Sequence, residues 1–259
     1  MWEALINKRD TLWVLLGILA LLLLWELGSL ALGSDLLLPN PWKTFVTLLN
    51  LLVTRRFLEA LGMSFLRILL SVAIVIPLSL VVGIPAALDR HFRAFMRPLF
   101  VVIASTPVLS IILIAFIWFG QERTPIFSAF LMMFPVLTSN IMAGIQSADP
   151  RLLEVLELYE IPERRRLRYL YIPSLIPYLF AGLHSALSLC WKVVVAAEVI
   201  VQPRQALGTG MQMAKAQLET TELLAWTAAT VLMAALTESV FLASKHYFLY
   251  SDADHDHQH

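Results

Sequence analysis

The hydrophobic residues of this chain come in long blocks rather than alternating with polar residues. Six blocks are long enough to span a membrane, at residues 12–33, 63–88, 98–119, 125–147, 173–201 and 222–248. A helix needs about 20 residues, each rising 1.5 Å, to cross the hydrocarbon core of a bilayer. The pattern therefore predicts an all-α fold, a polytopic transmembrane bundle of about six spanning helices.

The composition agrees with this fold class and excludes others. Of the 259 residues, 59% are hydrophobic and only 15% are charged, and the mean hydropathy is +0.75. A soluble domain has about 25% charged residues. The net charge is zero, so the chain lacks the basic surplus of a nucleic-acid-binding protein, and we expect no nucleic-acid partner.

The blocks also set the expected domain boundaries. Residues 1–11 are predicted to be a cytoplasmic N-terminus, 12–248 a single transmembrane domain, and 249–259 a disordered cytoplasmic tail. The first block follows Lys8 and Arg9, as in a signal peptide, but it is too long for one and contains Glu26, so we expect a retained helix. The tail ends in alternating histidines; a solvated segment is favoured over metal binding, and no metal site is predicted.

Charge and proline placement predict how the chain lies in the membrane. Lysines and arginines concentrate in the segments that are cytoplasmic when both termini are inside, although Arg55 and Arg56 then lie on the outer side. Pro39 and Pro41 prevent the first helix from continuing, and Trp42 suits an interface. The residues from Trp42 to Ala60 therefore predict a short helix on the membrane surface.

The loop at 149–173 is the most informative segment. Asp149 is a suitable N-cap and Pro150 a suitable first helical residue. Apolar side chains then recur at helical spacing, the helix breaks near Pro162, and a strongly basic piece follows. The pattern fits a rigid helix that protrudes from the bundle toward a partner; it fits equally an ordinary loop with positive-inside arginines.

This loop resembles the EAA loop of type I ABC importer permeases. Glu154 falls on the leading glutamate of that motif, and Ile161-Pro162 follows in register. Val155 and Leu156 replace the two alanines, and Glu160 stands where the family has glycine. Glycine there permits a left-handed turn, which glutamate resists.

Further motifs in the expected order extend the resemblance over about residues 38–248. They are similar to the nitrate/sulfonate/taurine/bicarbonate-type permeases, of the binding-protein-dependent transport system inner membrane component family. The matching segments are Pro39-Asn40-Pro41-Trp42, Ser64-Phe65-Leu66-Arg67, Trp191 to Glu198, and Ala206-Leu207-Gly208, where Ala206 replaces a glycine.

The resemblance implies a function and a set of partners. It implies a permease in the bacterial inner membrane that forms a homodimer and imports a small solute, either a nitrate-, sulfonate- or taurine-like anion or a vitamin precursor. Two cytoplasmic ABC ATPase subunits and an extracytoplasmic solute-binding protein complete the transporter. The chain has no phosphate-binding G-x-x-x-x-G-K-[ST] motif. We therefore expect that it is not an enzyme and needs no cofactor, and that the partner ATPase subunit binds ATP. The residues expected to dock on the ATPase are Glu154, Glu157, Pro162, Arg164 and Arg165.

Polar residues inside the hydrophobic blocks are candidates for the translocation path, because ionisable groups in a membrane usually face a cavity or a partner. His184, Ser188, Lys192 and Glu198, with Trp191 among them, fall within an arc of roughly 120° on one helix. Other spans contribute Arg67, Ser105 and Asn140. Two alternatives stay open: Lys192 and Glu198 form a structural ion pair, and the small hydroxyl residues serve helix packing.

Two other functions compete with an importer permease. A secondary transporter driven by an ion gradient often has repeats of inverted topology, and no such halves are evident. An intramembrane enzyme needs a nucleophile–base pair or a metal-ligand cluster, and His184 beside Ser185 is a poor dyad because neighbours on a helix point about 100° apart.

Overall fold

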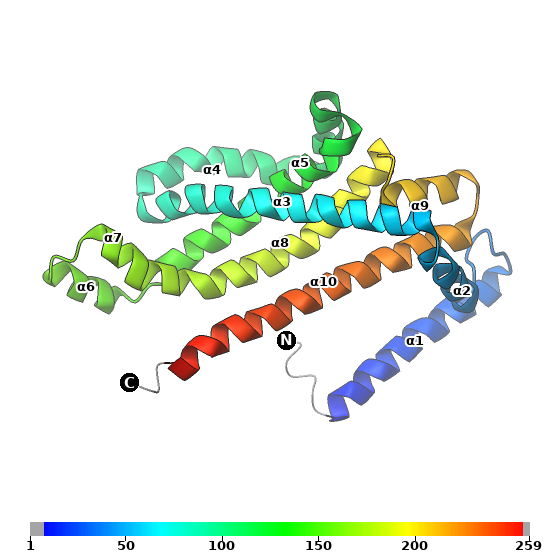
Figure 1. Cartoon of the computed structure of the whole chain (residues 1–259), viewed down its shortest axis with the longest axis horizontal. Coiled ribbons are helices and arrows are strands. Elements are labelled where there is room, and N and C mark those ends of the chain that lie inside the picture. Colours follow the sequence, from blue (N-terminus) through cyan, green and yellow to red (C-terminus); the bar gives the residue numbers. More distant parts are fainter. Residues whose placement is uncertain (1–7, 256–259) are drawn as a thin grey trace.

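The computed structural model describes the backbone of residues 8–255 and the side chains of residues 11–243; within these limits the chain is helical and has no strand. The all-α prediction is therefore confirmed. In chain order the elements are α1 (Lys8–Leu32), α2 (Pro41–Leu52), α3 (Arg55–Leu88), α4 (Arg90–Ser105), α5 (Val108–Gln146), α6 (Pro150–Leu158), α7 (Glu163–Arg166), the π-helix η2 (Leu167–Tyr171), α8 (Ile172–Val201), α9 (Leu207–Ala216) and α10 (Thr220–His255) (Figure 1).

The helices begin where the sequence supplies a side chain to accept from their free N–H groups. The Asn40 side chain accepts from Lys43 N, Thr54 from Phe57 N, and Asp89 from His91 N. Asp149 likewise accepts from Arg151 N, and Pro150 is the first residue of α6. Each cap satisfies a donor that the helix itself leaves unpaired.

Five helical segments in the described part of the chain are long and apolar enough to cross a membrane, against the six predicted. The third predicted block, 98–119, is not one helix. Extended backbone at Thr106 and Pro107 ends α4 and starts α5, since proline has no N–H to continue the helical hydrogen bonds. Gly120, at φ 69°, then divides α5 into two arms, and the second contains the predicted block 125–147.

The core of the bundle is formed by α5 packed against α8 and α3. Small residues bring these helices close together: a Cβ on Gly182 would lie 2.6 Å from the Asn140 side chain, and one on Gly144 would lie 2.9 Å from that of Tyr178. Such contacts let helices associate in lipid, where apolar surface alone gives little driving force. The helix α1 lies at the edge of the bundle with most of its leucines exposed.

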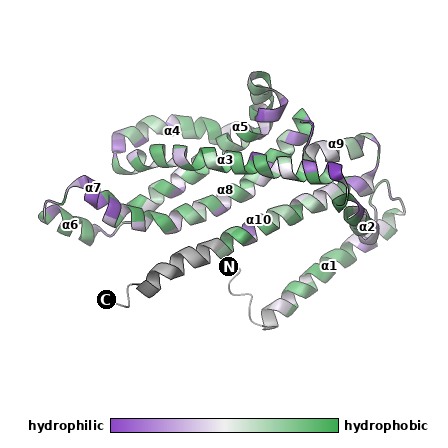
Figure 2. Ribbon diagram, viewed as in Figure 1, coloured by the Kyte–Doolittle hydropathy of each residue, from purple (hydrophilic) through white to green (hydrophobic). Residues whose placement is uncertain are grey.

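The polar residues gather at the two ends of the bundle, as Figure 2 shows. One end carries α6 and α7, and the other carries α9 and the start of α3 (Figure 1). A short helix is present where one was expected, as α2, in which Trp42 is 69% exposed while Thr44 and Leu48 are buried. It ends at Leu52, and the rest of the predicted stretch to Ala60 belongs mainly to α3. Its location on the membrane surface stays a prediction.

The structure differs from the expectation at the C-terminal tail. The helix α10 continues to His255, although a disordered tail was predicted from residue 249. No proline or glycine interrupts this stretch, so nothing in the local sequence stops the helix. Residues 256–259, and residues 1–7 of the expected cytoplasmic N-terminus, lie outside the described part of the chain.

Candidate functional site

The loop at 149–173 folds as a short exposed helix followed by a sharp turn. None of the residues of α6 is buried, and the apolar Leu152, Val155 and Leu158 on it are all exposed. Tyr159, which caps the helix, is 72% exposed. Exposed apolar side chains on a protruding helix give a surface that can pack into a partner. The predicted helix is confirmed; its docking role stays a prediction.

The turn after α6 has the left-handed geometry that glycine provides in the family. Glu160 has φ 49°. Its N–H donates to Glu157 O at 3.0 Å, and Ile161 N donates to Leu156 O at 3.0 Å. These two bonds are the Schellman motif, which satisfies the last carbonyls of a helix and needs a residue at positive φ. Glutamate in this chain therefore adopts the turn that it was expected to resist.

A single arginine braces this turn. Arg166 Nε donates to Ile161 O at 2.7 Å, and its Nη1 lies 3.6 Å from Glu157 Oε1. Arg164 and Arg165, which the sequence singled out, are exposed, as are Glu154 and Pro162. The predicted docking residues differ in their surroundings: Glu157 pairs with Arg166 of the same loop, whereas Glu154 is exposed and forms no ion pair with another described side chain.

At the other end of the bundle, Arg67 of α3 and Glu198 of α8 form a buried ion pair. Arg67 Nη1 lies 3.0 Å from Glu198 Oε1, with the side chains 3% and 0% exposed. Arg67 also donates to Gln205 O at 2.9 Å and to Glu122 Oε2 at 2.6 Å. Ser64 Oγ lies 2.8 Å from both carboxylate oxygens of Glu198. A buried ion pair is tolerated only when its remaining donors and acceptors are satisfied.

The same group of residues caps α9. Ala206 is at the N-cap position and has no polar side chain to accept a hydrogen bond. Instead, Leu207 N donates to Ser64 Oγ at 3.0 Å and Gly208 N donates to Glu198 Oε2 at 3.2 Å. The negative carboxylate also lies at the positive end of the helix dipole. A Cβ on Gly208 would come within 2.5 Å of Val199 N, so only glycine permits this approach of α9 to α8.

The structure corrects one interpretation of the charged residues. Glu198 pairs with Arg67, and not with Lys192, which is exposed. Lys192 and Glu198 lie at the two edges of the predicted arc, about 120° apart on α8; at its edge Lys192 is exposed, whereas α3 places Arg67 directly against Glu198. Glu122 was missed by the sequence reasoning; an acidic residue just after a helix-breaking glycine was the only signal.

The other predicted path residues lie on three helices, with Ser105 in α4, Asn140 in α5, and His184, Ser188 and Trp191 as helical neighbours on α8. Ser105 is exposed and bonds back to Val101 O, and Asn140 donates to Val136 O. Trp191 is buried, whereas His184 and Ser188 are half-buried. Within the described side chains, Trp191 Nε1 and His184 Nδ1 have no hydrogen-bond partner. Their role in a path remains a prediction.

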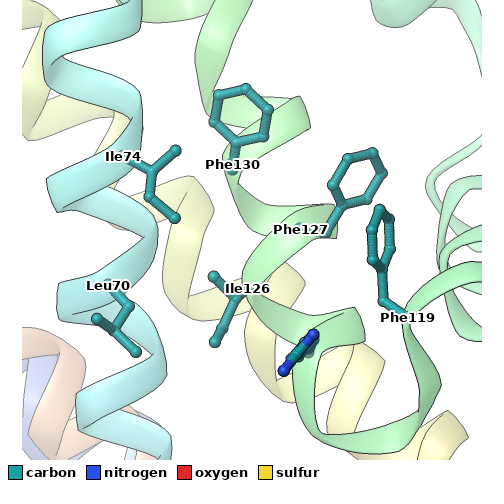
Figure 3. Close-up of a pocket in the computed structure, with 7 residues that line it drawn as sticks. Leu70, Ile74, Phe119, Ile126, Phe127 and Phe130 are labelled. Carbon is teal, nitrogen blue, oxygen red and sulfur yellow. The ribbon is translucent and has the colours of Figure 1, made fainter.

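A hollow of about 390 Å³ lies between α3 and α5, and none of the predicted path residues lines it. Leu70 and Ile74 line it from α3, and Phe119, Ile126, Phe127 and Phe130 from α5 (Figure 3). The rings of Phe119 and Phe127 are 4.7 Å apart. Arg123 is the one charged lining residue.

Comparison with known proteins identifies the family. Residues 76–248 match the family described as "Binding-protein-dependent transport system inner membrane component". The chain is 28% identical over 245 residues to the taurine transport system permease protein TauC of Escherichia coli (strain K12), covering 92% of this chain and 88% of TauC. It is 24% identical to the putative aliphatic sulfonates transport permease protein SsuC of Bacillus subtilis (strain 168), covering 68% of this chain and 65% of SsuC. It is 26% identical to the bicarbonate transport system permease protein CmpB of Synechococcus elongatus, covering 75% of this chain and 73% of CmpB.

Solved structures support the same fold. A bacterial ABC transporter involved in the import of the acidic polysaccharide alginate aligns with a TM-score of 0.62 at 14% identity, covering 95% of this chain and 97% of the other. An amino acid ABC transporter aligns with a TM-score of 0.57 at 17% identity, covering 74% and 92%. The matches favour an importer permease over a secondary transporter. The chain therefore belongs to the binding-protein-dependent transport system inner membrane component family, and it is a multi-pass inner membrane permease subunit of an ABC importer.

Proposed function

We propose that two copies of this permease form the transmembrane pathway and that each docks α6 on a separate cytoplasmic ATPase subunit. The observation that carries the proposal is the exposed, braced helix α6 at one end of the bundle (Figure 1). A docking element that transmits force must be rigid, and the Schellman turn together with Arg166 supplies that rigidity.

The way α6 joins the bundle supports a coupling role. Residues 147–149 connect α6 to the end of α5, and α7 and η2 connect it to the start of α8. Since α5 and α8 pack most extensively against each other, a displacement of α6 acts on the core of the bundle. Closure of the ATPases on ATP would then rock the bundle between outward-open and inward-open states, as rigid elements move about an interface.

A small anion is the proposed cargo. The relatives include permeases described as transporting taurine, aliphatic sulfonates and bicarbonate. A solute-binding protein on the outer side would deliver the anion to the paired permeases. ATP is proposed to bind only the partner subunits, because the sequence carries no phosphate-binding loop of its own.

The docking role is tested by reversing the charge of Glu154. Glu154→Lys is expected to reduce strongly the ATP-dependent uptake of the solute by proteoliposomes that contain the assembled transporter, because a cation replaces the outward-facing carboxylate of α6. The ATPase subunits should also dissociate from the purified permease more readily. We expect a reduction in uptake of about 10²-fold, in line with the loss of a charged interface contact of about 2–3 kcal/mol.

Glu219→Lys is the matched control, because Glu219 is exposed next to α9 at the opposite end of the bundle. It should leave the ATPase bound and the uptake unchanged. Normal uptake and ATPase association in Glu154→Lys would refute the assignment of α6 as the docking element.

A further inference from the structure

A second hollow, of about 370 Å³, is lined by α9 and the start of α3. These elements lie at the end of the bundle that is opposite to α6 (Figure 1). The wall of the hollow comes from the start of α3, from the segment that follows α8, and from α9 and α10. The lining residues are Arg55, Arg56, Glu59, Ala60, Arg204, Gln205, Ala206, Thr209, Gly210, Met213 and Trp226. Three arginines and one glutamate in this wall give it a surplus of positive charge.

The only carboxylate in the wall is already occupied. Glu59 Oε1 accepts from Arg55 Nε at 2.7 Å, and Glu59 Oε2 accepts from the Gln205 side chain at 2.8 Å. Glu59 therefore neutralises Arg55 and holds the 203–206 segment against α3. It leaves the other two arginines of the hollow without an anion.

Those two guanidinium groups have no anionic partner in the described part of the chain. The nearest hydrogen-bond acceptor of Arg56 is the thioether of Met213, at 2.6 Å from Nη2, and sulfur is a weak acceptor. The Arg204 side chain forms no hydrogen bond within the described residues; only its backbone N–H donates, to Glu122. Two exposed cations that line one hollow and lack a counter-charge make a site complementary to an anionic group.

The position of Arg56 at the start of α3 is electrostatically unfavourable for the helix. Arg55 and Arg56 are the first two residues of α3, and its first turn carries no acidic residue. Positive charge at a helix N-terminus is disfavoured by the helix dipole. Glu59 compensates Arg55, but Arg56 has no acidic partner among the described residues. A local rule that is broken in this way points to a functional use, and a bound anion would supply the missing compensation.

The floor of the hollow is closed. Trp226 is 1% exposed, and a Cβ on Gly210 would lie 2.5 Å from its ring. Behind Ala206, the Arg67–Glu198 pair fills the space between α3 and α8. Packed side chains bound the hollow on this side, which fits a docking site better than a transport path.

We propose that this hollow receives an acidic side chain of the extracytoplasmic solute-binding protein, with Arg56 and Arg204 as its partners. The inference rests on the proposed function, because docking of α6 on a cytoplasmic ATPase places the hollow on the outer side. Gln205 and Arg204 also connect the hollow to the buried ion pair, through Gln205 O to Arg67 and Arg204 N to Glu122. Docking therefore acts on residues that hold α9 in place.

The test measures the affinity of the assembled transporter, in nanodiscs without nucleotide, for the solute-loaded binding protein of the same importer. Arg56→Glu combined with Arg204→Glu is expected to raise the dissociation constant about tenfold or more and to flatten its dependence on salt.

The doubly conservative variant, Arg56→Lys with Arg204→Lys, should keep most of the affinity. The control Lys215→Glu makes the same kind of charge change on an exposed residue of α9 outside the hollow and should bind as the wild type does. The basal ATPase rate and the melting temperature of each variant show that it is folded.

Each other outcome would overturn the proposal. An unchanged dissociation constant in the double variant removes the hollow as the docking site, and an equal loss in Lys215→Glu shows a general charge effect instead. Loss of bound anionic lipid with unchanged affinity assigns the hollow to a lipid headgroup. Loss of direct taurine binding with unchanged affinity assigns it to the free solute. If the wild type binds no binding protein, the proposed partner fails as well, whereas the Glu154→Lys test reports only on the ATPase side.

Discussion

The fully buried Glu198 has more polar partners than any other acidic side chain of the described chain. Its carboxylate accepts from Ser64, Arg67 and the N–H of Gly208. Glu198→Ala would leave the guanidinium of Arg67 in a dry interior with only the half-exposed Glu122 as a counter-charge, and α9 would lose part of its cap. Breaking such a pair from one side costs about 3–5 kcal/mol. We expect a clear fall in the melting temperature of the purified permease.

Glu198→Gln separates the charge from the hydrogen bonds. Glutamine can still accept from Gly208 N and Ser64, so this variant should lie between the wild type and Glu198→Ala in melting temperature. Equal stability of Glu198→Ala and the wild type would contradict the account of Arg67 and Glu198 as a mutually dependent buried pair.

The turn that ends α6 holds a glutamate in the left-handed conformation. Glycine adopts φ 49° without the steric cost of a Cβ, so Glu160→Gly should stabilise the turn by about 0.5–1 kcal/mol after its greater freedom in the unfolded chain is counted. Amide hydrogen exchange along α6 in the assembled transporter should slow by about two- to fivefold, the ratio that corresponds to this energy.

Glu160→Val gives the opposing control, because a β-branched side chain is more strained at positive φ. It should speed exchange along α6 while leaving the exchange of α3 and α8 unchanged. Faster exchange in Glu160→Gly than in the wild type would show that the glutamate side chain stabilises the loop, a result that the geometry does not predict.

We expect the end of the bundle that carries α6 to face the cytoplasm and the end that carries α9 to face the outside. The single native cysteine, Cys190, is buried, so labelling by a membrane-impermeant maleimide in intact cells should have a low background. Lys215→Cys, on exposed α9, should be labelled readily, and Arg151→Cys, on α6, only after the cells are opened. The converse pattern would show that the permease has the opposite orientation.

Local features of the structure were predictable because the residues that determine them are adjacent in the chain. Asp149 and Pro150 specify where α6 begins, and the apolar blocks specify most spans. The third block was wrong as one helix because its hydrophobicity hides a break at Thr106 and Pro107. At Glu160, a bias against positive φ was outweighed by the two hydrogen bonds that close the Schellman turn.

The partners of the charged residues could not be predicted in the same way. Arg67 and Glu198 are 131 positions apart, and Glu122 is 55 positions from Arg67. Lys192, which is nearer in the chain, was the only residue considered from the sequence as an ion-pair partner of Glu198. Spacing within one helix says which face a residue occupies, but it does not say which helix packs against that face.

Hydrophobic block length, helix caps and ordered motifs were therefore enough to predict a helical membrane permease and the position of the exposed helix α6, because these depend on neighbours in the chain and on the thickness of a bilayer. The tertiary structure alone decided that Glu198 joins Arg67 and caps α9, and that Arg56 and Arg204 share a hollow without a counter-charge. Those outcomes depend on how α3, α8 and α9 pack. In a medium of low dielectric constant, the packing determines which charges meet and which remain open to a partner.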